Sequence, residues 1–154
     1  SGVIIKDNVI IRSHTVLEKC IINSDSIIGP SARIRPNSKI GKNVKIGNYV
    51  EIKNSVIGNN TSISHLSYIG DSKLGNNINI GAGTITCNYN GKKKNKTIIE
   101  SNVFVGSNCS LIAPLKIGSH STIAAGSVIT KNIPQNHLAI ERNEIKIYKK
   151  MRKK

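Results

Sequence analysis

The sequence repeats with a period of six residues over most of its length. Aliphatic residues recur at this spacing, with a few single steps of five. They stand at Ile5, Ile11, Leu17, Ile22, Ile28, Ile34, Ile40, Ile46, Ile52, Ile57, Ile63, Ile69, Leu74 and Ile80, and then at Ile99, Val105, Leu111, Ile117, Ile123 and Ile129. Neither an amphipathic helix nor a long strand has a period of six. The repeat therefore requires another architecture.

A coil of short parallel strands explains this period. Each hexad supplies a short strand and a corner, three hexads close a triangular turn, and stacked turns pair strand on strand about 4.8 Å apart. The aliphatic residue points inward, and Gly, Asn and Asp at the corners tolerate unusual backbone angles. With 38% hydrophobic but only 3% aromatic residues, a globular core of large side chains is not expected. We predict an all-β parallel β-helix, a triangular prism of about seven coils.

The repeat is interrupted once and ends before the carboxyl terminus. Residues 88–96 contain no aliphatic side chain, so the chain must leave the coil there as a loop, and Asn90-Gly91 suits its turn. Pro134 ends the pattern. We therefore expect a β-helix domain over 1–133 and a non-repeating basic tail over 134–154, laid along the prism.

The chain is strongly basic, with a formal net charge of +15. Many of the cations gather in the loop and the tail, at Lys92, Lys93, Lys94, Lys96, Lys146, Lys149, Lys150, Arg152, Lys153 and Lys154. Such patches attract nucleic acid, acidic lipid or phosphorylated small molecules. Aromatic residues interleaved with the charge, which nucleic-acid binding favours, are nearly absent, and no apolar run is long enough to span a bilayer. We expect neither nucleic acid nor a membrane as partner.

Cysteine and histidine usage argues against a metal cluster. The three cysteines are widely spaced with no Cys-x-x-Cys motif, and none of the four histidines is paired at a ligand spacing. We expect reduced thiols, a cytoplasmic location and no metal.

The register predicts which side chains stack, since equivalent positions one coil apart are vertical neighbours. Three such columns contain chemically interesting residues: Arg35, Lys53 and Gly70; Arg33, Glu51 and Tyr68; and Asn48, His65 and Ala82. Two cations stacked about 5 Å apart repel by roughly 1–3 kcal/mol at a surface-like dielectric. A bound phosphate would turn this cost into a gain, while the alternative is two solvated side chains splayed apart. His65 is a candidate general base, because histidine is the side chain that most often moves protons in catalysis; the alternative is a surface histidine without a chemical role.

Two stretches resemble a known family closely. They are His65-Leu-Ser-Tyr-Ile-Gly-Asp and Gly81-Ala-Gly-Thr-Ile-Thr-Cys-Asn-Tyr-Asn-Gly, with Lys94 and Lys96-Thr-Ile-Ile downstream. They are similar to the acetyltransferase domain of the bacterial bifunctional N-acetylglucosamine-1-phosphate uridylyltransferase/glucosamine-1-phosphate acetyltransferase. The resemblance implies a left-handed β-helix of hexapeptide repeats that transfers the acetyl group of acetyl-CoA to glucosamine 1-phosphate. The product would supply UDP-N-acetylglucosamine for cell-wall biosynthesis.

The resemblance also implies roles for single residues. His65 would be the general base for the attacking amine. The sugar phosphate would be bound by Arg35, Lys53, Tyr68, Asn79, Glu51 and Lys94. Acetyl-CoA would be bound by Ala82, Asn88, Tyr89, Ser107, Ala125 and Arg142. Asn88 or Ser107 could stabilise the tetrahedral oxyanion. The family forms a homotrimer with its sites between subunits. Nothing in the chain resembles the family's Gly-rich nucleotide loop, so uridylyl transfer is not expected of it.

The sequence departs from the family pattern at two places. The usual Asn-Tyr-Asp-Gly is Asn88-Tyr-Asn-Gly, and the usual Ser-Arg-Val-Pro is Glu141-Arg-Asn-Glu. Three other interpretations stay open. A hexapeptide acyltransferase with another sugar acceptor would not require Arg35 stacked on Lys53. A structural or ice-binding β-helix predicts regular Thr or Ser ladders and no loop bearing Lys94. A nucleic-acid binder has only the net charge in its favour.

Overall fold

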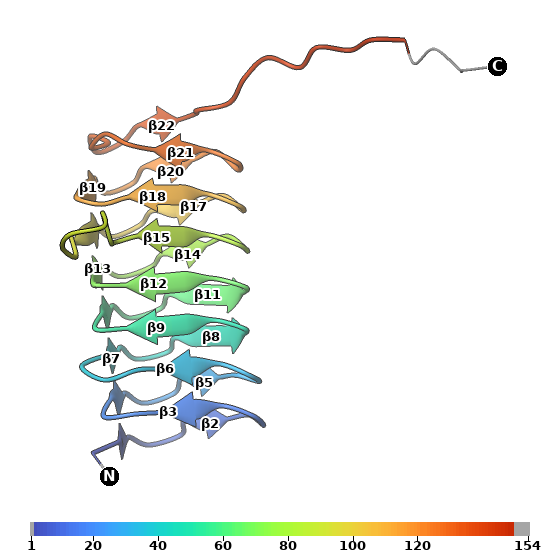
Figure 1. Cartoon of the computed structure of the whole chain (residues 1–154). Helices are drawn as coiled ribbons and strands as arrows, with labels where there is room; N and C mark the ends of the chain where they lie inside the picture. Colours follow the sequence, from blue (N-terminus) through green and yellow to red (C-terminus); the bar gives the residue numbers. More distant parts are fainter. Residues whose placement is uncertain (1, 150–154) are drawn as a thin grey trace.

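The chain forms a stack of triangular coils in a computed structural model, which describes residues 2–149 (Figure 1). Sheet A contains β1 (Ile4–Ile5), β4 (Ile21–Ile22), β7 (Lys39–Ile40), β10 (Val56–Ile57), β13 (Ser72–Leu74), β16 (Thr97–Ile99) and β19 (Leu115–Ile117). Sheet B contains β2 (Ile10–Ile11), β5 (Ile27–Ile28), β8 (Lys45–Asn48), β11 (Ser62–His65), β14 (Asn79–Ile80), β17 (Phe104–Val105), β20 (Thr122–Ile123) and β22 (Leu138–Ala139). Sheet C contains β3 (Val16–Leu17), β6 (Arg33–Ile34), β9 (Glu51–Lys53), β12 (Tyr68–Gly70), β15 (Ile85–Cys87), β18 (Ser110–Ile112) and β21 (Val128–Ile129). Across the described residues, no helix is long and apolar enough to cross a membrane.

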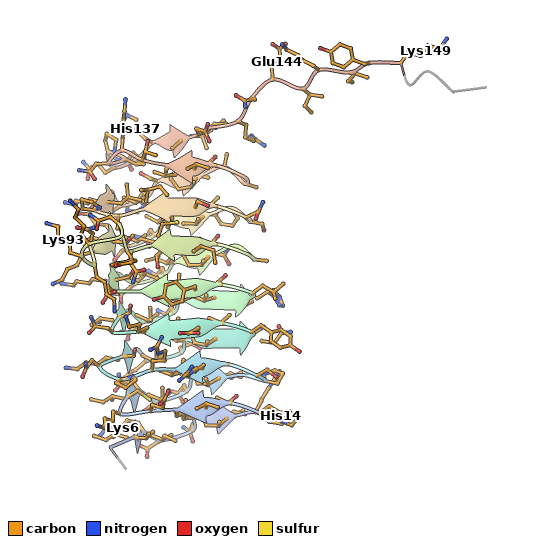
Figure 2. The ribbon with its side chains drawn as sticks, in the orientation of Figure 1. Lys6, His14, Lys93, His137, Glu144 and Lys149 are labelled. Carbon is orange, nitrogen blue, oxygen red and sulfur yellow. The ribbon has the colours of Figure 1, made fainter. Side chains whose placement is uncertain are left out.

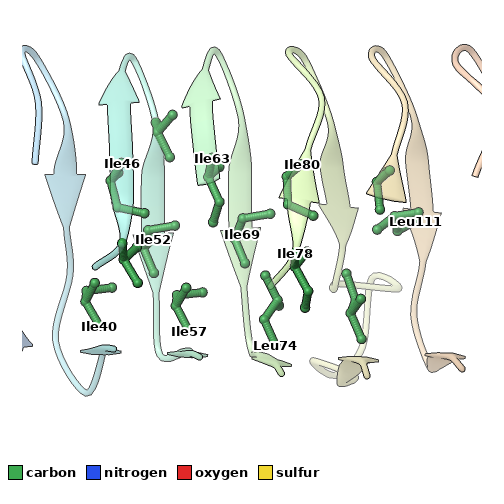
Figure 3. Close-up of a cluster of buried hydrophobic side chains, with 14 of the residues drawn as sticks. Ile40, Ile46, Ile52, Ile57, Ile63, Ile69, Leu74, Ile78, Ile80 and Leu111 are labelled. Carbon is green, nitrogen blue, oxygen red and sulfur yellow. The ribbon is translucent and has the colours of Figure 1, made fainter. Parts of the chain in front are cut away.

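The predicted inward residues form the core (Figure 3). Neighbouring strands pair in parallel and in register, so that Ile40 stacks on Ile57 and Ile57 on Leu74. Nearly all of the repeat aliphatics from Ile22 to Ile129 are less than 5% exposed. Ile5 and Ile11 are 47% and 37% exposed, because only one neighbouring coil covers them. Burial is therefore greatest for residues with coils on both sides.

The corners place polar residues in the left-handed backbone region. Asparagine predominates there, as the corner geometry predicts. At the corner between sheets A and B, the side-chain amides form a ladder in which Asn43 donates to Asn60 at 2.9 Å and Asn60 to Asn77 at 3.1 Å. The ladder continues from Asn77 to Asn102 at 3.0 Å, across the interruption in the repeat. Each rung satisfies a corner side chain and fixes the vertical register.

The loop leaves the coil after a regular strand. Thr86 takes the inward position where the repeat lacks an aliphatic residue, and it is 1% exposed. Its carbonyl accepts from Asn88 N at 3.0 Å and so turns the chain outward, while its hydroxyl accepts the bond from Gly70 N at 2.8 Å. The threonine side chain thus replaces an acceptor that the ladder loses. The repeat therefore keeps its register at this coil, with Thr86 in the position of the aliphatic residue.

The upper end differs from the expectation in two ways. Parallel pairing continues past Pro134, because β22 pairs with β20 and Leu138 lies opposite Thr122. The tail that follows does not lie along the prism: it extends away from it (Figure 1), with Ile145 and Ile147 83% and 89% exposed. A weak apolar series without a complementary surface provides too little burial to hold it. The predicted tail cations Lys150, Arg152, Lys153 and Lys154 lie outside the described residues.

Candidate active site

A column of five residues runs up the corner between sheets B and C. We call it the His65 column, and it consists of Asn48, His65, Ala82, Ser107 and Ala125. Main-chain hydrogen bonds connect successive levels: Gly83 N donates to His65 O at 3.3 Å, Asn108 N to Ala82 O at 2.7 Å, and Gly126 N to Ser107 O at 2.8 Å. The predicted general base and three predicted acetyl-CoA residues therefore share one edge of the prism.

One neighbour orients the imidazole of His65. The side chain is exposed at the end of β11, and its Nδ1 lies 3.0 Å from Oδ1 of Asn48 in the coil below. An amide oxygen can only accept, so Nδ1 carries the hydrogen in this pair and Nε2 keeps its lone pair. The register that stacks His65 on Asn48 thereby selects the tautomer that has a free basic nitrogen.

Arg142 lies at the upper end of the same column. A Cβ built on Gly126, the residue after Ala125, would lie 3.9 Å from Cδ of Arg142. The side chain thus reaches the corner from the chain beyond β22. Small residues occupy the column above His65, so an extended ligand could lie along it with a cation at its far end.

A second group of residues meets at the corner between sheets C and A. We call it the cation corner, and it consists of Arg35, Glu51, Lys53, Tyr68, Asp71, Asn88 and Lys94. The predicted columns are present, since Glu51 lies between Arg33 and Tyr68, and Lys53 opposite Gly70. A cleft of ≈ 370 Å³ opens here, lined by Arg35, Pro36, Asn37, Lys53, Asn54, Asp71 and Lys94. Lys94 lines it from the loop, in which the neighbouring Lys93 is labelled in Figure 2.

The two stacked cations each have a carboxylate of their own. Arg35 Nη1 lies 2.8 Å from Glu51 Oε1, and Lys53 Nζ lies 3.9 Å from Asp71 Oδ2. The repulsion expected from the sequence is therefore offset within the protein, which the register alone could not indicate. Three cations face two carboxylates at this corner, so it still favours an anion.

Asp71 is the buried centre of the cation corner. Its carboxylate accepts from Asn54 Nδ2 at 2.6 Å and from Asn88 Nδ2 at 2.5 Å. Burial raises the pKa of this carboxyl, but these two hydrogen bonds and the ammonium groups of Lys53 and Lys94 outweigh burial and lower the pKa overall. The nearby Lys53 ammonium lowers the pKa of Lys94. Asp71 therefore stays ionised between two lysines.

Gly70 makes room for a site residue rather than for the cation pair. A Cβ at this position would lie 2.6 Å from Cζ of Tyr68 and 2.7 Å from Nδ2 of Asn88. The Tyr68 hydroxyl occupies that space and accepts from Asn88 Nδ2 at 3.3 Å. The space beside Gly70 is thus filled by the side chain of Tyr68.

Two predicted residues lie apart from both groups. Asn79 is exposed on sheet B, between Ser62 and Phe104. Tyr89 is in the loop, 61% exposed, with its hydroxyl donating to Gly91 O at 2.7 Å. One chain therefore does not bring the whole predicted set into one pocket.

Sequence reasoning assigned no role to Asp71. The residue ends the quoted stretch His65-Leu-Ser-Tyr-Ile-Gly-Asp, but an Asp at a corner is also the ordinary corner residue. The available signal was that it stands one residue after the column of Arg35, Lys53 and Gly70.

Two family models match the chain. The model described as GMPPB C-terminal domain matches residues 16–90, and the bacterial transferase hexapeptide model (six repeats) matches residues 96–131. The bifunctional protein GlmU of Thermodesulfovibrio yellowstonii is 62% identical over 94 residues, which are 61% of this chain and 21% of that protein. Over this stretch the chain is similar to GlmU, in keeping with the resemblance seen in its motifs. The predicted left-handed β-helix of hexapeptide repeats is confirmed.

Solved structures share the fold at lower identity. UDP-N-acetylglucosamine acyltransferase from Campylobacter jejuni superposes with a TM-score of 0.67 at 19% identity, covering 86% of this chain and 64% of that one. A mutant of GDP-perosamine N-acetyl transferase from Caulobacter crescentus, in complex with CoA and GDP-perosamine, gives 0.59 at 22% identity, covering 82% and 54%. The chain spans about a fifth of the length of the curated GlmU relatives it matches.

Proposed function

We propose that the chain transfers the acetyl group of acetyl-CoA to the amine of glucosamine 1-phosphate, giving N-acetylglucosamine 1-phosphate. The observation that supports this most directly is the hydrogen bond between Asn48 and His65 Nδ1, which leaves Nε2 as a free base. The choice of substrates follows the family resemblance of the stretches at His65 and Gly81, which the 62% identity to GlmU over 94 residues supports.

The chemistry assigned to His65 is a single proton transfer. The substrate amine attacks the thioester carbonyl carbon, a C–N bond forms and the C–S bond breaks. Nε2 takes the proton that the nitrogen loses, and the CoA sulfur leaves as a thiolate that takes up a proton. Of the two expected oxyanion donors, Ser107 would donate the hydrogen bond, because the N–H groups of Asn88 are already bonded to Thr86, Asp71 and Tyr68. Acetyl-CoA would lie along the His65 column toward Arg142, with Ala82 and Ala125 leaving space for it.

The cation corner would hold the sugar phosphate. Arg35, Lys53 and Lys94 provide charge-assisted donors, and Tyr68 and Glu51 stand beside them on the same sheet. The corner and the His65 column lie at opposite edges of sheet C, and Asn79 lies on sheet B. A site that uses all of them needs a second copy of the chain, so a homotrimer with shared sites is part of the proposal. The three free cysteines are in keeping with a cytoplasmic location.

Release of CoA thiol tests the proposal, measured with and without glucosamine 1-phosphate. We expect His65→Ala to lower kcat by about 10²–10⁴-fold, the usual contribution of a general base. His120→Asn is the matched control, because His120 is also a corner histidine and an asparagine would extend the Asn ladder there. Equal rates for wild type and His65→Ala would remove the base assignment.

The acceptor is tested separately. Glucosamine 6-phosphate and a UDP-linked amino sugar should release much less thiol than glucosamine 1-phosphate. A strong preference for one of these would instead favour a hexapeptide acyltransferase with another sugar acceptor. Lys53→Ala should raise KM for the sugar phosphate more than KM for acetyl-CoA.

The proposed homotrimer has its own test: sedimentation equilibrium should give three times the chain mass.

A further inference from the structure

Asp71 is a buried carboxylate whose partners all lie in or beside the cation corner. It is 9% exposed, and Lys53, its ion-pair partner, is 17% exposed. A buried charge is costly unless it is paired and hydrogen-bonded. Its hydrogen-bond and ion-pair partners are Asn54, Asn88 and Lys53. Lys53 belongs to the predicted sugar-phosphate set and Asn88 to the predicted acetyl-CoA set.

The corner itself does not require an acid. The two positions below Asp71 in the same corner are Asn37 and Asn54, which have the same left-handed backbone, with φ of 64° and 46° against 49° at Asp71. Both asparagines are exposed, whereas Asp71 is covered and bonded to the first residue of the loop. The carboxylate therefore serves something other than the turn.

The carboxylate determines which way Asn88 faces. The amide nitrogen of Asn88 donates to Asp71 Oδ2 at 2.5 Å and to the Tyr68 hydroxyl at 3.3 Å. Both amide hydrogens are then in use, so the carbonyl oxygen is what Asn88 can offer a ligand. Asn54 bonds to one carboxylate oxygen of Asp71 and Asn88 to the other. An asparagine at position 71 would replace one of these oxygens by an NH2 group, which would face another amide donor, so one pair would reorient.

The same carboxylate holds Lys53 without consuming its donors. The 3.9 Å between Lys53 Nζ and Asp71 Oδ2 is longer than a hydrogen bond. The ammonium is attracted toward the cleft, while its hydrogens stay available to an anion. Lys94, which stands close to Lys53, experiences the same negative charge.

We propose that Asp71 is a positioning residue for acetyl transfer, which fixes Asn88, Tyr68 and the Lys53 ammonium at the end of the site that takes the sugar phosphate. This inference rests on the proposed function. Asp71 touches no reacting atom in this scheme; it acts through the residues it orients.

The test compares Asp71→Asn with Asp25→Asn. Asn fits the corner backbone, as Asn37 and Asn54 show. Asp25 is a matched control because it has φ of 63° at another corner and also accepts from an asparagine, Asn8, at 3.2 Å. We expect Asp71→Asn to lower kcat by about tenfold or more. KM for the sugar phosphate should stay the same or fall, since the lysines lose a competing anion, and KM for acetyl-CoA should stay within twofold.

Asp25→Asn should leave kcat and both KM values unchanged. A kcat for Asp71→Asn within twofold of wild type would overturn the proposal. The proposal would also be overturned if Asp71→Asn had a lower kcat, higher KM values for both substrates and a lower melting temperature than Asp25→Asn. That pattern would indicate a structural role only.

A second readout needs no turnover. The Asp71 charge raises the pKa of Lys94, so NMR titration of the Lys94 ammonium should give a lower pKa in Asp71→Asn than in wild type. The Asn88 side-chain amide hydrogens should also exchange faster, while Asp25→Asn should leave both signals unchanged. If wild type fails to acetylate glucosamine 1-phosphate, the proposed function fails and these signals still decide the role of Asp71. Unchanged Lys94 and Asn88 signals would reject it.

Discussion

Replacing Gly70 by alanine should disturb the candidate site more than the stability of the β-helix. The added methyl group would lie 2.6 Å from Cζ of Tyr68 and 2.7 Å from Nδ2 of Asn88, where ordinary contact is 3.4–4 Å. Its three nearest neighbours are all side-chain atoms. The Tyr68 ring can swing outward, so the overlap of about 1 Å is relieved near the lower end of the roughly 1–3 kcal/mol that overpacking costs.

Gly47→Ala provides the contrast. Its Cβ would lie 2.6 Å from the carbonyl carbon and 2.9 Å from Cα of Ser64, which is main chain of the next coil. No rotamer change relieves that overlap, so the coils must separate. We expect a loss of about 3 kcal/mol or more in the free energy of unfolding, at or beyond the upper end of the overpacking range.

The two variants should therefore fail in different ways. Each kcal/mol corresponds to roughly 2–4 °C in melting temperature for a domain of this size, so Gly70→Ala should melt a few degrees below wild type and Gly47→Ala much lower. Thiol release by Gly70→Ala should show kcat/KM reduced by about tenfold or more, because the methyl group displaces Tyr68 and Asn88. A tenfold reduction corresponds to a loss of about 1.4 kcal/mol of transition-state stabilisation. The reasoning is refuted if Gly70→Ala keeps full kcat/KM or loses as much stability as Gly47→Ala.

Three further predictions use other parts of the structure. Asn48→Ala removes the acceptor that holds His65 Nδ1 and should lower kcat about tenfold with little change in melting temperature; full activity would show that the tautomer needs no partner. The pKa of the Asp71 carboxyl is lowered from its ordinary 3.8, so the stability it contributes is present above pH ~4 and is lost as the pH falls through the folded pKa. Urea unfolding should show the difference between wild type and Asp71→Asn shrinking below pH ~4, and a constant difference would contradict this. Ile52→Val, at a fully buried position, should cost about 0.5–1.5 kcal/mol, whereas Ile5→Val, 47% exposed, should cost less, and equal costs would contradict the burial gradient.

The sequence predicted the scaffold because one rule governs each level of it. A β-branched residue every sixth position can be buried only in a coil of that period, and the period then determines every vertical neighbour. The stack of Glu51 and Tyr68 and the stack of Asn48 and His65 follow from counting residues.

The directions in which side chains point could not be predicted from the register. The register placed Arg35 below Lys53 but gave no sign that Glu51 would pair with one and Asp71 with the other, because those contacts depend on rotamers. Thr86 was missed for a related reason. A hydroxyl at an inward position looks like an interruption until the turn shows that it supplies a hydrogen-bond acceptor.

The loop after β15 returns the chain to the prism without altering its register. Ser72 pairs with Thr97 across a gap of 25 residues, where most other levels are separated by 17 or 18, and the ladder passes from Asn77 to Asn102 as if nothing intervened. The coils on either side of the loop therefore pair in the same register as the other coils. The length and charge of the loop can change without any coil having to move. Under the proposed function, a different loop would change the surroundings of the acceptor while the coils that carry His65 stay the same.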